Sequence, residues 1–494
     1  MKKYNSTSPK LYGLRKVHKP NLNIRPIVSC INSPSYNISC FIHQIMSQVT
    51  STSPYNVKNS FEFVSLVKTV SVPEGYCLIS LDVISLYTNV VKDLTVKIVK
   101  KRWKYISAFT NIPKTLFLEM IVFIFTSSYF KFNNEYYRQI DGMAMGNPAS
   151  PSIANLVLTE LIQECINQLS FWVPVIALYV DDLFLIVPAN KCRELLTAFN
   201  QFHPRLQFTL EMEKDNSLPF LDVVVHRRED GSLITNWYRK PTSSGRILNY
   251  NSYCSFAYKI SAVKNLIYRS INLSDRSFHN DNLKVIREIL KLNNYPKSLS
   301  NKIISSTNLV SGPSGSDSVD VIGRMTCFKF PYIEGLSNPI KNLIRGASEN
   351  VKLASYSLSV CGSLFSRLKD VDTVLDRSEV IYKIPCMNCH KCYIGQTKQL
   401  LGNRIKQHKY NCNESFKSKD NNTALATHHF SEHHNFNFQA ASILDVESNW
   451  MKRNISEMIY IKLNNTVNCR TDTQNLSLVY TGILDLFKNK YPTR

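Results

Sequence analysis

Residues 175–187 read VIALYVDDLFLIV, with the adjacent aspartates Asp181 and Asp182 between two apolar segments. Apolar runs of this length, rich in β-branched and aromatic residues, predict two strands with the acidic pair at the hairpin between them. Carboxylates held by rigid strands can bind the divalent metal ions that phosphoryl transfer requires. Acidic pairs at turns are also common on solvated surfaces, so this interpretation depends on the rest of the chain.

Two upstream segments strengthen the interpretation of Asp181 and Asp182 as metal ligands. In residues 80–89, SLDVISLYTN, Asp82 ends an apolar run, where a strand would carry it beside the hairpin. In residues 139–151, QIDGMAMGNPASP, glycines precede a predicted helix and let the backbone approach a nucleotide and its template closely. Taken alone, the first segment could be an ordinary strand end and the second an ordinary glycine turn.

The segments around these motifs predict an α/β layer with helices packed on one sheet. The predicted strands are Tyr76–Leu81, Val175–Tyr179, Leu183–Val187 and Phe220–His226, and the predicted helices are Lys114–Ser127, Ser150–Gln168 and Cys192–Phe202. Residues 1–60 predict the strands and turns of a small fingers-like element. Residues 255–295 have basic helical periodicity, which fits a thumb-like bundle gripping a duplex or a solvated helix pair equally well. Residues 298–320, dense in Ser, Gly and Asn, are the best linker candidate.

The composition favours a polyanionic partner. The 494 residues exceed the size of a single domain, and 59 Lys+Arg against 37 Asp+Glu give a formal net charge of +22. A hydrophobic content of 44% argues against general disorder. Thirteen mostly scattered cysteines, and residues 1–10 without an apolar signal-peptide core, indicate a reducing intracellular compartment. The most apolar stretch, Leu116–Phe125, is too short for a membrane span, so no membrane partner is expected.

In their order and spacing, the three acidic and glycine-rich segments resemble the polymerase motifs of reverse transcriptases. More narrowly, LYGLRKVHKP at 11–20, RPIVS at 25–29, residues 81–89, LPFLD at 218–222 and YRKPT at 238–242 look like the reverse transcriptase of Penelope-like retroelements. The resemblance covers nearly the whole chain. It begins inside the fingers, so an N-terminally shortened copy is expected.

This resemblance implies two sets of site residues. The residues expected to hold Mg²⁺ or Mn²⁺ are Asp82, Asp181 and Asp182. The residues expected to bind nucleotide are Arg25, Tyr87, Gln139 and Gly146. Among these, Tyr87 would be the steric gate that rejects a ribose 2′-hydroxyl, and Arg25 would face the incoming triphosphate, a role that suits a guanidinium. The alternative for Arg25 is a surface arginine beside a proline turn.

The last part of the chain carries a second constellation. Residues 380–384, VIYKI, and 392–397, CYIGQT, predict strands with Tyr382 and Tyr393. Arg404 and His408 stand on one face of a following helix, because they are four residues apart. With Glu457 on a predicted helix, they could supply the cation, base and metal carboxylate of a nuclease. Each of these residues alone is more commonly structural.

The ordered set resembles the GIY-YIG endonuclease domain, which is characteristically attached to Penelope-like polymerases. The resemblance implies that the catalytic residues are Tyr382, Tyr393, Arg404, His408 and Glu457, the last as a metal ligand. It implies supporting roles for Gly395 and Asn468, with Asn464 and Asn465 competing for the place of Asn468.

A possible zinc site lies within the same region. Cys386 and Cys389 have Cys-x-x-Cys spacing, and four histidines follow at 428, 429, 433 and 434. Two thiolates and two imidazoles fit a tetrahedral structural Zn²⁺ site, for which His428 and His433 are the chosen histidines. The alternative is a pair of reduced, metal-free cysteines beside a histidine-rich loop.

The expected fold is thus α+β and multidomain, a right-hand polymerase followed by a small α/β GIY-YIG nuclease. The expected domains are partial fingers at 1–75, palm at 76–245, a thumb-like helical region at 246–297, linker and connector at 298–378 and nuclease at 379–494. The resemblance implies target-primed reverse transcription, with an RNA template, a DNA primer or target and deoxynucleoside triphosphates as partners. Nuclear residence follows from these substrates. Two alternatives stay open: a nuclease-only protein and a catalytically impaired nucleic-acid-binding relic.

Overall fold

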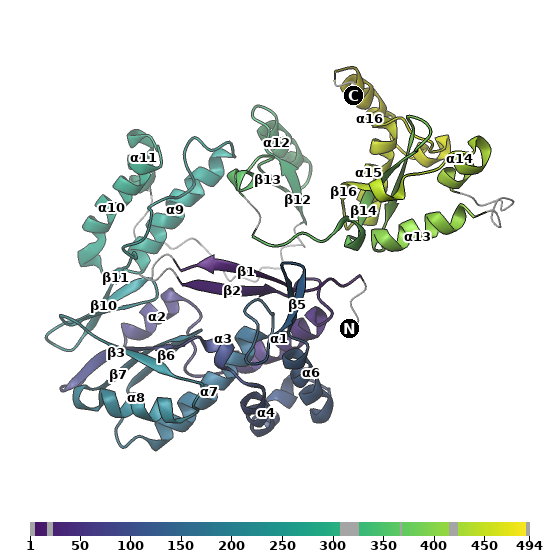
Figure 1. Cartoon of the computed structure of the whole chain (residues 1–494). Helices are drawn as coiled ribbons and strands as arrows, with labels where there is room; N and C mark the ends of the chain where they lie inside the picture. Colours follow the sequence, from purple (N-terminus) through teal and green to yellow (C-terminus); the bar gives the residue numbers. More distant parts are fainter. Residues whose placement is uncertain (1–4, 17–22, 307–325, 366–367, 414–422, 491–494) are drawn as a thin grey trace.

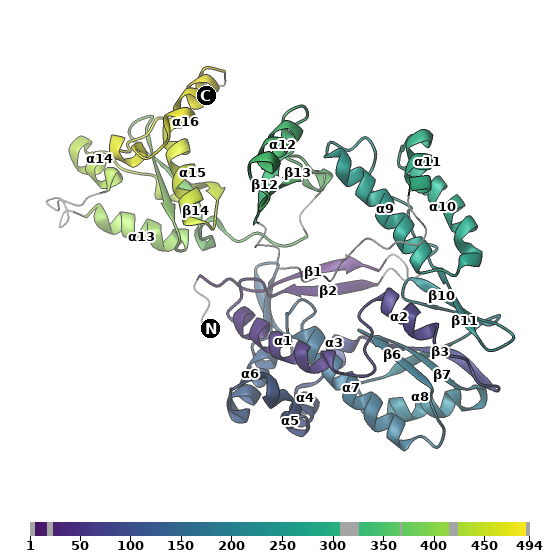
Figure 2. The ribbon, with the colours of Figure 1, turned by 180° about the vertical axis from the view of Figure 1, so that it is seen from behind.

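The computed structural model describes residues 5–16, 23–306, 326–365, 368–413 and 423–490, and it shows a mixed α+β chain. Figure 1 shows a main body formed by the described residues up to Ser306, and a C-terminal unit that stands to one side of it beyond a small connector. Figure 2 shows the same separation from behind.

The centre of the main body is a four-stranded antiparallel sheet in the order β6-β7-β3-β8. Its strands are β3 (Tyr76–Val83), β6 (Val175–Tyr179), β7 (Asp182–Pro188) and β8 (Phe208–Met212). Its hairpin and the preceding strand agree with the sequence prediction. We call this sheet and its covering elements the palm.

Helices cover one face of the palm sheet, and a smaller sheet with one helix covers the other. The first face carries α1 (Tyr36–Ser51), α4 (Lys92–Lys101), α6 (Lys114–Thr126), α7 (Ser150–Gln168) and α8 (Cys192–Gln201). The second face carries α2 (Ser60–Val67) and the sheet β9 (Ser217–Phe220), β10 (Val223–Arg227) and β11 (Leu233–Trp237). The predicted strand 220–226 is therefore wrong as a single element, because Leu221 at φ 54° turns the chain between β9 and β10.

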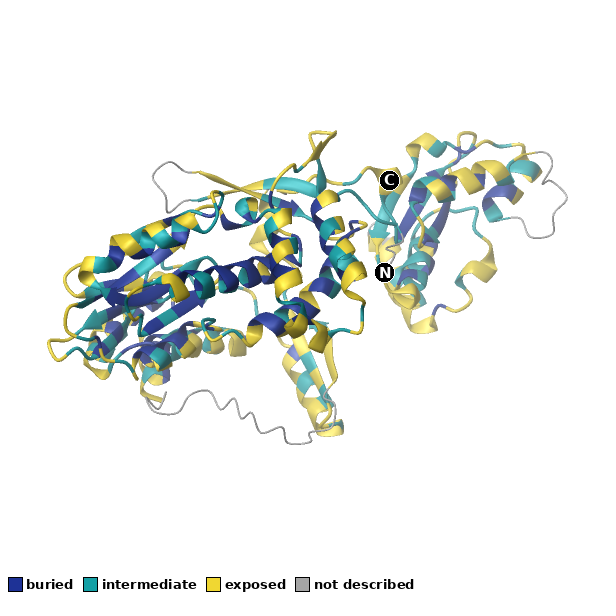
Figure 3. Ribbon diagram, turned by 90° about the horizontal axis from the view of Figure 1, so that it is seen from below, coloured by how far each residue is buried: buried dark blue, intermediate teal, exposed yellow. Residues whose placement is uncertain are grey.

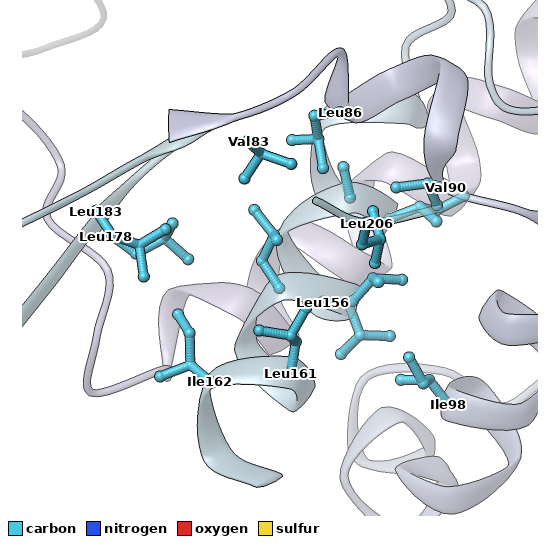
Figure 4. Packing of buried hydrophobic residues seen from close by; sticks show 14 of the residues in the cluster. Val83, Leu86, Val90, Ile98, Leu156, Leu161, Ile162, Leu178, Leu183 and Leu206 are labelled. Atoms are coloured by element: carbon cyan, nitrogen blue, oxygen red, sulfur yellow. The ribbon is translucent and has the colours of Figure 1, made fainter. Parts of the chain in front are cut away.

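Alternation along the strands produces these two cores. Leu81 and Val83 of β3 face the helix-covered side, whereas Leu78 faces the second sheet. Figure 4 shows Val83 near the buried residues of the α7 side. A one-residue slip of β3 against β7 would exchange the side chains that face the two cores. The register of these strands is therefore strongly specified.

The fingers-like element is a four-stranded sheet in the order β2-β1-β4-β5. Its strands are β1 (Lys10–Arg15), β2 (Ile24–Ser29), β4 (Tyr129–Phe132) and β5 (Glu135–Arg138). Its inner residues Val28 and Cys30 pack with Ala144, and Figures 1 and 2 both draw β1 and β2 above the palm. The element thus also includes residues 129–138, which follow β3 in the chain. The expectation of strands and turns over residues 1–60 is corrected, because Tyr36–Ser51 forms α1 and packs in the palm core.

A helical unit follows the palm. It consists of α9 (Phe256–Asn272), α10 (His279–Leu292) and α11 (Lys297–Ser306) around one apolar cluster. The Ser274 hydroxyl accepts a hydrogen bond of 2.9 Å from the Trp237 amide, which fastens the unit to β11. The predicted linker is corrected over its first part: residues 298–306 are helical because Leu299 and Ile303 pack into this cluster. The rest of that prediction, residues 307–320, lies outside the described residues.

The connector contains a small β-α-β unit of β12 (Thr326–Pro331), α12 (Ser337–Ala347) and β13 (Val351–Tyr356), with its two strands parallel. The segment after it crosses the fingers-like sheet. There Lys10 forms a 2.8 Å ion pair with Asp372, and the Lys369 ammonium donates to the Ser29 hydroxyl at 3.1 Å. These contacts attach the connector to the start of the chain.

The C-terminal unit has a three-stranded antiparallel sheet in the order β15-β14-β16. Its strands are β14 (Val380–Pro385), β15 (Cys392–Thr397) and β16 (Ser442–Val446). Its helices are α13 (Leu401–Asn411), α14 (Ala424–Glu432), α15 (Trp450–Leu463) and α16 (Leu478–Lys490). The strand predicted at 380–384 and the helix predicted at 455–463 are confirmed. Helix α15 begins at Trp450, five residues before its predicted start at Ile455.

Figure 3 shows the buried residues along the interior strands and helices of each body, with exposed residues around them. Among the described residues, no single helix is long and apolar enough to span a membrane. One bent pair, Trp103–Phe109 with Lys114–Thr126, passes that test of length and composition jointly, with a bend of 94°. In this structure Phe117, Ile121 and Ile124 of that pair are buried in the palm core.

Candidate functional site

The three aspartates predicted to bind metal come together at one end of the palm sheet. Asp82, the penultimate residue of β3, is directly opposite Asp182, the first residue of β7. Asp181 precedes it in the hairpin, and its carbonyl accepts a hydrogen bond of 3.1 Å from the Val83 amide. Opposed residues on antiparallel strands have Cβ atoms about 5 Å apart, so two carboxylates repel there unless a cation lies between them.

The turn between β6 and β7 has an uncommon backbone. Val180 adopts φ 59°, a left-handed conformation that is unusual for a β-branched residue. Such strained residues persist where the surrounding structure fixes them, and they concentrate at functional sites. Here the conformation places Asp181 and Asp182 directly after Val180, partly exposed at one end of the sheet.

Tyr87 and Arg25 belong to the same electrostatic environment as the aspartates. Tyr87 lies on the short helix α3 (Leu86–Asn89), and Arg25 lies on β2 opposite Leu14. Burial raises the pKa of the Tyr87 hydroxyl, the Asp181 carboxylate raises it further, and the Arg25 guanidinium opposes this. A phenol, a carboxylate and a cation from three elements therefore act on one another electrostatically, and their roles in nucleotide binding stay predictions.

The glycine-rich segment joins α3 to the fingers-like sheet. The Met143 amide donates to the Tyr87 carbonyl at 2.6 Å, and the Val28 amide donates to the Met145 carbonyl at 2.8 Å. Gly146, at φ 119°, lies against β2, where a Cβ would be 2.4 Å from the Val28 carbonyl oxygen. The segment thus fixes β2, which carries Arg25, relative to the helix that carries Tyr87.

Gly142→Ala tests this junction. The glycine has φ 74°, and an added Cβ would be 2.3 Å from the Thr88 carbonyl oxygen, so α3 must move or the fold must strain. We expect a loss of stability of about 2 kcal/mol or more, together with weakened function of the Tyr87 site. Gly75→Ala is the matched control, because Gly75 has φ 79° but nothing within 4 Å of the added atom. Equal losses of unfolding free energy in both variants would contradict the close approach.

Gln139 lies at the start of the same segment. Its side-chain amide donates to the Asp141 carbonyl at 2.9 Å, and its backbone amide donates to the Ser128 carbonyl at 2.8 Å. With Lys92 and Arg138 it lines a cavity of about 250 Å³. Its role in nucleotide binding stays a prediction.

The C-terminal unit brings its predicted polar residues around Tyr382. The Tyr382 hydroxyl is 2.7 Å from His408 Nε2, and Arg404 Nε donates to that hydroxyl at 3.4 Å. Burial raises the pKa values of Tyr382 and Tyr393, the latter to about 12. Burial, assisted by the Arg404 charge, lowers the pKa of His408 to about 3, so its imidazole is neutral.

These protonation states define the direction of the hydrogen bonds. We infer that the Tyr382 oxygen accepts from Arg404 and that the Tyr382 hydroxyl donates its proton to Nε2 of His408. The histidine proton is then on Nδ1, which is buried and has no hydrogen-bond partner among the described residues. The raised pKa of Tyr382 and the lowered pKa of His408 keep the proton on the tyrosine, so the imidazole orients this hydroxyl.

Glu457 lies on α15 beside this cluster. Burial raises the pKa of its carboxyl to about 7, and the nearby Asp472 carboxylate adds to the effect. Sequence reasoning did not single out Arg453, which is 1% exposed and donates to the Gln396 side chain at 2.8 Å. The Arg453 charge and the Gln396 backbone amide both favour the ionised form of Glu457. The position of Arg453 one turn before Glu457 gives no sign of burial in the sequence, so only the structure identifies it.

Gly395 and Asn468 hold the second tyrosine strand. Gly395 is opposite Tyr382 on β14, and a Cβ there would be 2.6 Å from the Tyr382 hydroxyl oxygen. The Asn468 side chain accepts from the Ile394 amide at 3.0 Å and donates to its carbonyl at 2.8 Å. Asn464 instead bonds the Tyr460 carbonyl, which favours Asn468 as the supporting residue.

Four possible metal ligands meet at the other end of β14. The side-chain atoms of Cys386, Cys389, His428 and His434 all lie within 4.8 Å of one another. The choice of His433 is corrected, because that residue ends α14 at φ 55° with an exposed side chain. The left-handed turn there brings the next residue, His434, to the thiols, and its Nδ1 is 3.7 Å from Cys386 Sγ.

With the palm sheet, its aspartate cluster and the fingers-like element in place, the main body defines a nucleic-acid polymerase. Residues 17–219 match the family model described as "Reverse transcriptase (RNA-dependent DNA polymerase)", so the chain contains a reverse transcriptase domain. A second family model, "Animal helix-turn-helix domain", matches residues 246–305, the unit of α9 to α11. This match ends one residue before α11 does, in agreement with the corrected boundary.

Among solved structures, telomerase from Candida albicans in complex with a telomeric RNA fragment is similar at 11% identity over 60% of this chain and 56% of that chain, with TM-score 0.42. Apo telomerase from Candida tropicalis is similar at 12% identity over 62% of this chain and 61% of that chain, with TM-score 0.40. The RNA-dependent RNA polymerase of a human picobirnavirus is similar at 11% identity over 58% and 56%, with TM-score 0.42. This chain thus spans less than two thirds of the length of each. No curated protein sequence matches it significantly.

Proposed function

We propose that this chain is an RNA-directed DNA polymerase of the Penelope-like type, with a GIY-YIG nuclease that nicks DNA and thereby supplies the primer. The observation that carries the proposal is the cluster of Asp82, Asp181 and Asp182 at one end of the palm sheet, with Tyr87 and Arg25 beside it. The Tyr382 cluster in the C-terminal unit supports the coupled nuclease.

The aspartate cluster fits divalent metal ions. Mg²⁺ and Mn²⁺ prefer carboxylate oxygens, and Asp82 and Asp182 place two carboxylates opposite each other on paired strands. When bound, two such ions neutralise the charge that develops as the primer 3′-hydroxyl attacks the α-phosphate and pyrophosphate leaves. The three carboxylates would hold them, and the rigid paired strands would keep the carboxylates aligned.

The other residues select and hold the nucleotide. Arg25, exposed on β2, would bind the triphosphate through its planar donors. Tyr87, held beside Asp181, would block the 2′-hydroxyl of a ribonucleotide and so restrict the product to DNA. The unit of α9 to α11 would grip the template–primer duplex, since Lys297 and Lys302 are exposed on α11. This use agrees with the helix-turn-helix match.

In the nuclease, neutral His408 would orient the Tyr382 hydroxyl through their hydrogen bond, and the two groups would position the attacking water. Arg404, at the same hydroxyl, would bind the scissile phosphate. Glu457 would hold a divalent cation, because the positive charge would favour the ionised form of a carboxyl whose pKa burial and Asp472 raise to about 7. The cation, once bound, would stabilise the charge on the phosphate.

We propose that the Cys386 cluster binds Zn²⁺ as a structural site. Zn–S distances of about 2.3 Å and Zn–N distances of about 2.0–2.1 Å in a tetrahedron require S···N separations of about 3.5 Å and an N···N separation of about 3.3 Å. The structure has S···N separations of 3.6 and 3.7 Å and an N···N separation of 3.1 Å. Zinc there would pin the loop after β14 to α14.

His434→Ala and His433→Ala form a matched pair for this site. We expect about one zinc per chain in the parent and in His433→Ala, and a marked loss in His434→Ala, because three ligands bind zinc more weakly than four. Elemental analysis after dialysis against a mild chelator measures the stoichiometry, and Cys386→Ser should behave like His434→Ala. A parent without zinc, or equal retention in both histidine variants, would contradict the assignment.

Coupling of the two activities is tested with closed circular DNA, an RNA template and labelled deoxynucleotides in Mg²⁺. We expect label covalently joined to a nicked DNA strand. If label is incorporated on an annealed primer but not on circular DNA, the proposed polymerase activity stands and the proposed coupling to a nuclease is contradicted. Nuclear residence is part of this proposal, because the target is chromosomal DNA, and imaging of the tagged full chain tests it.

A further inference from the structure

The guanidinium of Arg205 joins elements around the nucleotide site that are far apart in the sequence. Arg205 lies in the turn between α8 and β8, with its side chain 40% exposed. Its Nε donates to Asn89 Oδ1 at 3.3 Å, and its Nη2 donates to the Thr88 carbonyl at 3.2 Å. Its Nη1 donates to the Asp141 carboxylate at 3.1 Å. One side chain therefore holds both the end of α3 and the glycine-rich segment.

The helix that receives these bonds needs external support. α3 has only four residues, far fewer than an isolated helix requires for stability in water. It follows Ser85, which adopts φ 51°, and the Asn89 side-chain amide bonds the Ile84 carbonyl at 2.9 Å. Besides these local bonds, the Met143 amide at the Tyr87 carbonyl and the Arg205 fork hold α3 in place.

Tyr87 is in the middle of this helix, so the same contacts position its ring. A steric gate discriminates a deoxyribose from a ribose by the space of one hydroxyl group, and small displacements change such selection. We propose that Arg205 is a positioning residue that fixes Tyr87 and thereby sets the preference for deoxynucleotides over ribonucleotides. This inference rests on the proposed polymerase function.

The geometry also explains why an arginine is needed there. The three acceptors lie in different directions, and a planar guanidinium meets them with separate donors, whereas a lysine ammonium is a single point charge. The ion pair with Asp141 has both side chains substantially exposed, so it contributes little to stability by itself. We therefore expect Arg205 variants to fold and to differ in selectivity.

The test measures kcat/KM for single-nucleotide extension with a deoxynucleotide and with the matching ribonucleotide. We expect the ratio of the two to fall about tenfold in Arg205→Ala and by a similar amount in Arg205→Lys. Arg193→Ala, which removes an exposed arginine of the neighbouring helix α8, should leave the ratio unchanged. In the Tyr87→Ala background, Arg205→Ala should cause no further change, because both substitutions act on the same gate.

A second measurement needs no catalysis. Amide hydrogen exchange over residues 84–92 should be faster in Arg205→Ala and Arg205→Lys than in the parent, since α3 loses its support. An unchanged ratio in variants that still extend primers, an additive effect in the Tyr87→Ala background, or unchanged exchange over these residues would each overturn the inference. A parent that extends no primer would instead contradict the proposed polymerase function.

Discussion

Asp181→Asn is expected to reduce DNA synthesis by about a thousandfold or more, because a metal carboxylate contributes several kcal/mol to the transition state. The substitution keeps the shape and polarity of the side chain but removes its charge. Val180 at φ 59° and the Asp181 carbonyl, which bonds the Val83 amide, should keep the hairpin closed. The loss should therefore appear in kcat, with the melting temperature close to that of the parent.

The matched control for this variant is Asp215→Asn. Asp215 is exposed, and its φ of 49° is as acceptable to asparagine as to aspartate. Primer extension and thermal unfolding of the parent and both variants should show a catalytic loss in Asp181→Asn alone. Equal activity of the two variants would remove Asp181 from the metal site.

Glu457→Gln is expected to abolish DNA nicking, with a loss of about a hundredfold or more, while leaving primer extension intact. Plasmid nicking in Mg²⁺ measures the first activity and extension of an annealed primer measures the second. Glu432→Gln, at an exposed position of the same unit, is the control and should nick as the parent does. Equal nicking by Glu457→Gln and the parent would exclude Glu457 from the mechanism.

The same variant should change stability with pH in the absence of divalent metal. The pKa of Glu457 is raised from 4.5 to about 7, so its protonated form favours folding. That contribution is fully present below pH 4.5 and is lost as the pH rises through about 7. Glutamine cannot ionise, so Glu457→Gln should be more stable than the parent at pH 8 by about 3 kcal/mol, with the difference vanishing in acid. A pH-independent difference would contradict the burial of this carboxyl.

Local pattern determined much of the palm. The continuous apolar runs of 175–187 and 76–81 were sufficient to predict three of its four strands, because each face of that sheet is buried. The meeting of Asp82 with Asp182 needed a register that periodicity alone does not provide. It came from the resemblance, and the structure places the two residues opposite each other.

The errors came from single backbone turns and from composition. Leu221 at φ 54° divides the predicted strand, and His433 at φ 55° turns the chain so that His434 reaches the cysteines. A left-handed residue changes the chain direction without altering the pattern of polar and apolar residues, so the sequence did not reveal either turn. Residues 298–306 were predicted as linker from their serines and asparagines. Leu299 and Ile303, four residues apart, carried the helical signal that composition obscured.

Long-range contacts were beyond the sequence. Arg205 is separated from Thr88 and Asn89 by more than a hundred residues, and nothing in its own segment indicates three specific acceptors. Arg453 is similar, because a buried arginine resembles a surface one until its partners are known. Both were identified only by the hydrogen bonds in the folded chain.

Synthesis of DNA on an RNA template is the most direct test of the polymerase. The purified chain, with Mg²⁺, an RNA template, an annealed DNA primer and deoxynucleotides, should extend the primer to the end of the template. It should incorporate ribonucleotides far less efficiently, because Tyr87 stands beside the aspartates. Absence of extension by the folded parent in both Mg²⁺ and Mn²⁺ would contradict the assignment of Asp82, Asp181 and Asp182 as an active polymerase centre.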